Sequence, residues 1–198
     1  KLRLMANRSL KRSLDLIENL LDSVTVGAGE GMTLYYEEID VLEIITAVYE
    51  EALEIYPGKI ELENTEQEIK GIFDGTMIRR MLENLISNAI KYGKKESPVT
   101  LTVQDSDEIL VLSVHNWGNP ISKENQEHIF HFLKSTNGNG VKELKSWGMG
   151  LTLARAVAEA HGGKLSLKSS EREGTTFSVD LHKHKNSPGK RRTALNFR

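Results

Sequence analysis

The sequence places carboxamide and ammonium side chains at a spacing that could hold a metal and a phosphate. Asn84, Asn88 and Lys91 recur at intervals of four and three residues, so on a helix they lie one above another. Carboxamide oxygens are neutral ligands that suit Mg²⁺, and a lysine ammonium suits phosphate oxygens. The alternative is a polar helix face that is only solvated, and the spacing alone leaves both interpretations open.

Two glycine-containing stretches could bring backbone close to a ligand. Residues 114–121 read VHNWGNPI, which is typical of a strand that ends in a turn, although a plain turn would look the same. Gly148 and Gly150 open a predicted helix, where exposed amide N–H groups and the helix dipole favour an anion. The stretch lacks the Gly-Lys-Ser/Thr ending of a Walker loop, and no parallel strand precedes it as a dinucleotide fingerprint requires.

Hydrophobic periodicity and turn residues predict the elements that would position these stretches. Helices are expected over 41–55, 74–91, 123–131 and 151–161, and a mobile loop over 133–147. Strands are expected over 34–39, 60–63, 69–73, 98–103, 109–114, 165–169 and 175–181. This order predicts an α+β fold: a two-layer α/β sandwich whose mixed, largely antiparallel sheet is covered by helices on one face.

Upstream of the sandwich, the sequence predicts a single amphipathic helix over residues 1–26. Its apolar residues follow a heptad spacing, and Gly27, Gly29 and Gly31 end it. Such a stripe needs a partner helix, although packing on the chain's own sheet is the alternative. The seam consists of Leu10, Leu14, Ile17, Leu21 and Val24.

Composition excludes several classes of protein. The 198 residues contain no Cys, which excludes a disulfide scaffold, a thiolate zinc site and a cysteine nucleophile. No apolar run is long enough to span a membrane. The net charge of −2 hides a basic end, because residues 182–198 hold six Lys or Arg and no acid. This end is predicted to be a disordered, solvated tail, with contact to nucleic acid or a membrane surface as the alternative.

The order of the three stretches resembles the ATP-binding fold shared by sensor histidine kinases, gyrase, Hsp90 and MutL. Residues 81–92, MLENLISNAIKY, resemble the N box of sensor histidine kinases nearly residue for residue. Residues 114–121 are similar to the G1 box, 129–132 to a degenerate F box, and 146–151 to the G2 box. The chain is therefore identified as a member of this family. Residues 1–31 resemble the second helix and linker of the dimerisation hairpin, and 32–181 the ATP-binding catalytic domain.

The resemblance implies ATP and Mg²⁺ as ligands and a transfer of the γ-phosphoryl group to a histidine Nε2. Asn88 would ligate Mg²⁺, and the catalytic set would be Glu83, Asn84 and Lys91. Residues 133–147 would form a lid over the nucleotide. The nucleotide-binding residues it implies are Asn84, Asn88, Lys91, Tyr92, Asn116, Gly118, Ile121, Gly148, Met149, Gly150, Leu151 and Thr176.

The chain also departs from the family pattern. Asn116 stands where the family usually has Asp, Pro120 replaces a usual Gly, and Ser146 replaces the first glycine of the G2 box. A catalytically degenerate module that binds nucleotide weakly and acts by protein interaction is therefore the alternative function. A serine kinase or ATPase of the same fold is disfavoured by the helix over 1–26.

None of the six histidines has the setting of a phosphoacceptor; His161 is expected to cap a helix end. The implied partners are thus the missing phosphoacceptor helix, a second kinase chain in a homodimer, and a response regulator, but no nucleic acid. The resemblance implies a cytoplasmic location, with any membrane contact made through parts that this chain lacks.

Overall fold

A computed structural model describes residues 32–129 and 149–193 of the chain. The helices are α2 (Val41–Ile55), α3 (Gly75–Tyr92), α4 (Lys123–His128) and α5 (Met149–Ala160). The strands are β1 (Met32–Asp40), β2 (Ile60–Glu63), β3 (Lys70–Phe73), β4 (Val99–Asp105), β5 (Ile109–Asn116), β6 (Leu165–Ser170), β7 (Gly174–His182) and β8 (Gly189–Thr193). The predicted helix over 1–26 and the predicted loop over 133–147 lie outside the described residues.

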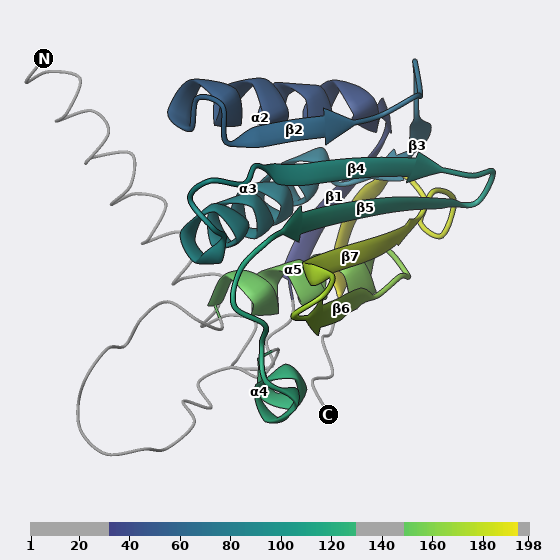
Figure 1. Cartoon of the computed structure of the whole chain (residues 1–198). Coiled ribbons are helices and arrows are strands. Elements are labelled where there is room, and N and C mark those ends of the chain that lie inside the picture. The colour runs from purple at the N-terminus through teal and green to yellow at the C-terminus, as the bar shows by residue number, and fades with distance from the viewer. Residues whose placement is uncertain (1–31, 130–148, 194–198) are drawn as a thin grey trace, which may run out of the picture.

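Five strands form the main sheet in the order β2-β4-β5-β7-β6, with β2 parallel to β4 and the other pairs antiparallel. In Figure 1, α3 and α5 lie behind this sheet, and α2 packs beside α3 near the β2 edge. The predicted two-layer α+β sandwich, with helices on one face of a mixed and largely antiparallel sheet, is confirmed.

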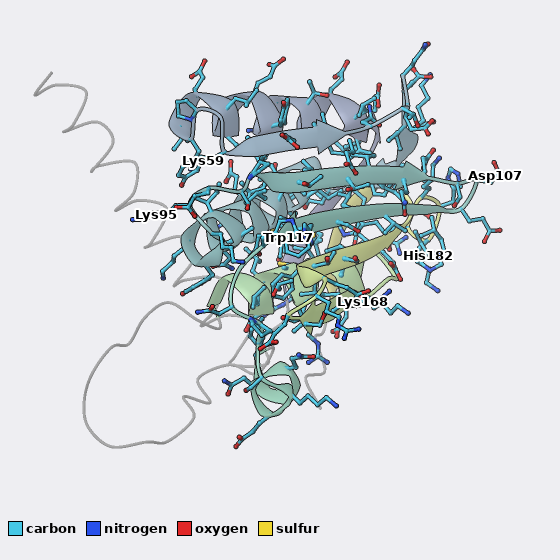
Figure 2. The ribbon with its side chains drawn as sticks, viewed as in Figure 1. Lys59, Lys95, Asp107, Trp117, Lys168 and His182 are labelled. Carbon is cyan, nitrogen blue, oxygen red and sulfur yellow. The ribbon has the colours of Figure 1, made fainter. Side chains whose placement is uncertain are left out.

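Strand alternation separates the two faces of the main sheet. On β5, Leu110, Leu112 and Val114 are buried under the helices and are paired with Leu181, Val179 and Phe177 of β7. The intervening residues point to the uncovered face, along which Figure 2 labels Trp117, Lys168 and His182. Since each strand buries every second side chain, a shift of one residue in the pairing register of a strand would turn its buried side chains to the uncovered face.

A second, three-stranded sheet corrects the prediction for the basic end of the chain. The expectation of a disordered tail over 182–198 is wrong for residues 182–193, because β7 reaches His182 and β8 pairs antiparallel with β1. The ammonium of Lys183 is buried and donates to the Asp105 carboxylate at 2.8 Å. An unpaired edge of β1 would leave backbone groups without partners, and β8 supplies them. Residues 194–198 lie outside the described part.

Helix α3 has one apolar face and one polar face, as the sequence predicts. The Asp74 carboxylate caps its first turn, with Oδ1 accepting from the Met77 amide at 3.0 Å. The inward stripe includes Ile78, Leu82 and Leu85, and all three are fully buried. The other side of the helix therefore stays available for polar residues.

No helix within the described ranges is long and apolar enough to cross a membrane.

His161 directly follows α5, as expected of a residue at a helix end, but it is fully buried. Its Nδ1 lies 2.8 Å from the Val157 carbonyl, which can only accept, and its Nε2 accepts from the Asp74 amide at 3.0 Å. These two partners fix the neutral imidazole with its proton on Nδ1. Desolvation by burial lowers the pKa of His161 below the usual 6.5.

Acid should therefore destabilise the fold through His161. In the unfolded chain this side chain takes up a proton near the ordinary histidine pKa of 6.5, whereas the folded chain resists protonation. The free energy of unfolding should then fall as pH drops below 6.5, by up to about 1.4 kcal/mol per pH unit until the folded pKa is reached. Urea unfolding at a series of pH values measures this slope. The variant His161→Gln, which cannot titrate, should show a shallower slope, and an unchanged slope would contradict the assignment.

Candidate nucleotide site

The C-terminal half of α3 carries the predicted polar face. Asn84 and Asn88 are half-buried and lie one turn apart, while Glu83 and Lys91 are exposed. The Asn84 Nδ2 donates to the Arg80 carbonyl at 2.9 Å, which fixes the orientation of its side chain.

Two charged groups border this face. The Glu83 carboxylate lies 3.8 Å from the guanidinium of Arg79, which also contacts Glu51 at 2.9 Å. The Lys91 ammonium lies 4.9 Å from the centre of the Tyr92 ring. The helix therefore presents two neutral carboxamides between an acid and an ammonium.

The start of α5 touches this face. A Cβ atom at Gly150 would lie only 2.7 Å from Oδ1 of Asn84, so glycine permits the close approach of the two helices. The contact places the first turn of α5, with its N-terminal amides, beside Asn84. Leu151 is buried, Met149 begins the helix, and Gly148 lies outside the described residues.

The turn after β5 lies against the end of α3. Gly93 and Gly118 form an isolated antiparallel bridge, and the Lys94 amide donates to the Trp117 carbonyl at 2.6 Å. A Cβ at Gly118 would lie 2.6 Å from the Tyr92 carbonyl oxygen, so this contact also depends on glycine. Two of the three predicted stretches therefore meet at the C-terminal end of α3.

Asn116 is only 5% exposed, and its Nδ2 lies 3.4 Å from the Trp117 carbonyl. On the neighbouring strand its register partner is Thr175, which is also buried and whose hydroxyl lies 2.7 Å from that of Ser169. Ser169 in turn accepts from the Ile121 amide at 2.9 Å, so the predicted Ile121 is held close to this group.

Thr176 is not brought to the other predicted residues. Its hydroxyl lies 3.0 Å from Nδ1 of His115, and both side chains belong to the uncovered face of the sheet. Its neighbour Thr175, which was not predicted, lies on the helix-covered side of β7 beside Asn116. The sequence carried a signal for this, because Phe177 and Val179 are apolar and strand alternation places Thr175 on their side.

The side chains present fit a magnesium ion that is carried by a nucleotide. Within residues 32–129 and 149–193, no group of three His, Asp or Glu side chains could hold a metal on its own. Mg²⁺ commonly keeps several waters and takes only one or two protein ligands beside substrate phosphates. The half-buried carboxamide of Asn88 suits one such position.

A groove of about 700 Å³ lies at the other end of α3, and it is a different feature from the site above. Tyr35, Ile39, Ile44 and Met77 give it an apolar wall. It contains none of the predicted site residues, so the nucleotide-site candidate rests on contacts at the opposite helix end.

The chain belongs to the family of histidine kinase-, DNA gyrase B- and HSP90-like ATPases. The profile of this family matches residues 73–185, which is more than half of the chain and includes all three polar stretches.

Relatives narrow the class to sensor histidine kinases. The chain is 28% identical over 171 residues to the sensor protein KdpD of Clostridium acetobutylicum, a match that covers 85% of this chain and 19% of KdpD. It is 32% identical over 160 residues to the sensor protein RprX of Bacteroides fragilis, covering 78% and 31% respectively. The chain thus spans about a fifth to a third of the length of these relatives.

Solved structures agree on the fold. A nucleotide-free catalytic domain of the histidine kinase ThkA matches with a TM-score of 0.66 and 27% identity, over 76% of this chain and 97% of that domain. The histidine kinase AdeS of Acinetobacter baumannii matches with a TM-score of 0.63 at 19% identity, over 90% of this chain and 84% of that one. The described domain therefore has the architecture of a histidine kinase catalytic domain.

The contact between Gly150 and Asn84 can be tested by a double-mutant cycle. Gly150→Ala should lower the free energy of unfolding by about 1–3 kcal/mol, because the added methyl overpacks against Oδ1 of Asn84. In the Asn84→Ala background Oδ1 and Cγ are gone and only the Cβ of residue 84 remains, at 3.3 Å, so the same change should cost clearly less. Urea unfolding of all four proteins measures both effects. An equal cost in the two backgrounds would show that this contact is not what requires glycine.

Proposed function

We propose that this chain binds Mg²⁺ and ATP where α3, α5 and the turn after β5 meet, and that it is the phosphoryl-transferring part of a sensor histidine kinase. The observation that carries this proposal is the convergence of three stretches that are far apart in sequence. Gly150 contacts Asn84, and Gly118 contacts the end of the same helix. In Figure 1 this junction lies at one end of the sandwich, at the left.

Each side chain has a role that its position allows. The first-turn amides of α5 donate to phosphate oxygens, and the Lys91 ammonium offsets their charge. The Asn88 carboxamide would hold the ion, and Mg²⁺ would there supply positive charge that offsets the charge of the phosphates. Asn116 accepts from the adenine amino group through Oδ1 while its Nδ2 faces the Trp117 carbonyl.

The phosphoacceptor is a histidine on a dimerisation helix that this chain does not carry. Its Nε2 attacks the γ-phosphorus, a P–N bond forms, and the bond from that phosphorus to the β-phosphate oxygen breaks to release ADP. The exposed Glu83 carboxylate accepts the Nδ1–H of the incoming imidazole, which keeps the Nε2 lone pair available for attack. The resemblance to sensor histidine kinases further implies that the whole protein works as a homodimer and passes the phosphoryl group to a response-regulator aspartate.

A nucleotide-weak regulatory module is the second candidate, and Asn116 is the observation that favours it. A carboxamide is neutral, so it holds an adenine amino group less strongly than a carboxylate would. Both functions share this fold, and nucleotide affinity distinguishes them.

Calorimetric titration with Mg²⁺ and ATP tests the proposed site. The chain should bind with a submillimolar dissociation constant, and Asn88→Ala should weaken binding at least about tenfold because an oxygen ligand is lost. Ser87→Ala is the matched control, since Ser87 is the exposed neighbour of Asn88 on the same helix. Absence of binding at several millimolar ATP would contradict the proposal and support the regulatory module.

The chain alone should not phosphorylate itself. Among the described histidines, His161 is fully buried and His115 is engaged with Thr176, while His182 and His184 follow one another at the end of the β5–β7 pair that lies away from Asn116. Incubation with Mg²⁺ and labelled ATP, followed by acid treatment, detects acid-labile phosphohistidine. Its appearance on this chain would overturn the assignment of the phosphoacceptor to another segment.

A further inference from the structure

The fully buried His161 lies at the far end of the two helices that carry the nucleotide site. We infer that His161 is a positioning residue whose hydrogen bond to the Asp74 amide keeps α3 and α5 in the register that nucleotide binding needs. This inference rests on the proposed function and concerns a residue that does not itself touch the nucleotide. His161 follows the last residue of α5, and Asp74 precedes the first residue of α3.

The two helices are joined at two points. At one end Nε2 of His161 accepts from the Asp74 amide at 3.0 Å, and at the other Gly150 contacts Asn84. Asn84 lies ten residues after Asp74, about 15 Å along α3, and Gly150 lies eleven residues before His161, about 16 Å along α5. The helices run antiparallel because the start of α3 contacts the end of α5 and the start of α5 contacts α3 further along, and the matching distances keep both contacts in register. A slip at either point would displace the other.

The Asp74 end is held rigidly. Its carboxylate accepts from the Met77 amide at 3.0 Å through Oδ1 and from the Tyr35 amide at 2.8 Å through Oδ2. Its own amide therefore points in a fixed direction, toward His161. The hydrogen bond from Asp74 to His161 thus links α5 to a point on α3 that cannot readily move.

The His161 end is equally constrained. Its Nδ1 donates to the Val157 carbonyl, and its backbone carbonyl accepts from the His182 amide at 3.1 Å. The Tyr36 ring packs edge-on at 5.2 Å between ring centres, and the Tyr36 hydroxyl donates to the Ala160 carbonyl at 2.7 Å. These contacts keep the imidazole from rotating, so its hydrogen bond to Asp74 holds α5 at a fixed position relative to α3.

Two substitutions separate the bonds of the imidazole. His161→Asn retains a donor near the Nδ1 position for the Val157 carbonyl but is too short to reach the Asp74 amide. His161→Gln places an acceptor near the Nε2 position and so can preserve the link to α3. Both remove the aromatic ring, so their loss of packing is similar. Tyr36→Phe is a further control. It removes a hydrogen bond at the same end of α5, but this bond joins α5 to β1 and not to α3.

We expect His161→Asn to weaken ATP binding about fivefold, while His161→Gln and Tyr36→Phe bind within about twofold of the unaltered chain. Thermal unfolding midpoints measured in parallel should fall for all three variants. If His161→Asn binds ATP as tightly as His161→Gln, the positioning role is wrong. If the unaltered chain fails to bind ATP, the proposed function fails instead, so the two failures are distinguishable.

Hydrogen exchange on the unaltered chain keeps the inference testable if His161→Asn does not fold. Coupling between two sites is reciprocal, so ATP bound at the Gly150 end should also slow exchange of the Asp74 amide. Slower exchange at Gly150 and Leu151 with no change at Asp74 would contradict the role of His161.

Discussion

The close approach of α3 and α5 is the constraint on which the rest of the site depends. The helices can meet at Asn84 only because position 150 lacks a Cβ atom, which would lie 2.7 Å from Oδ1. This contact places the first turn of α5 beside the polar face of α3. The apolar stripe on the other side of α3 fixes that face away from the sheet, since Ile78, Leu82 and Leu85 are fully buried. One side of α3 thus packs against the core, and the other side carries the polar residues of the proposed site.

Local patterns in the sequence predicted much of this arrangement. Asp74 and the helical spacing of apolar residues predicted the start and the inward face of α3, and the sequence pattern predicted β4, β5 and β7 to within two residues at each end. Features that depend on distant partners were not predictable in the same way. Charge alone suggested a disordered tail, whereas β8 is ordered by pairing with β1. His161 was expected to cap a helix, yet its burial and its bond to the Asp74 amide arise from a residue 87 positions away. The prediction of Thr176 took no account of strand phase, which places Thr176 on the uncovered face of the sheet and Thr175 on the side of the helices.

The metal and adenine positions of the proposed site are occupied by neutral carboxamides, and the charged Glu83 and Lys91 lie at the border of its helix face. Asn84, Asn88 and Asn116 are all carboxamides, and the described residues offer no carboxylate cluster that could bind a metal by itself. Such a site has little affinity for a free divalent ion, so metal and nucleotide are expected to arrive together. A carboxamide at 116 also avoids burying a charge, since Asn116 is only 5% exposed.

A crystal structure of the chain with Mg²⁺ and a non-hydrolysable ATP analogue would show directly where the nucleotide binds. We expect the triphosphate between Asn84, Asn88 and the first turn of α5, with the purine against Asn116 and Thr175. Density for the nucleotide in the groove between β1 and the start of α3, or none at a saturating concentration, would contradict this placement.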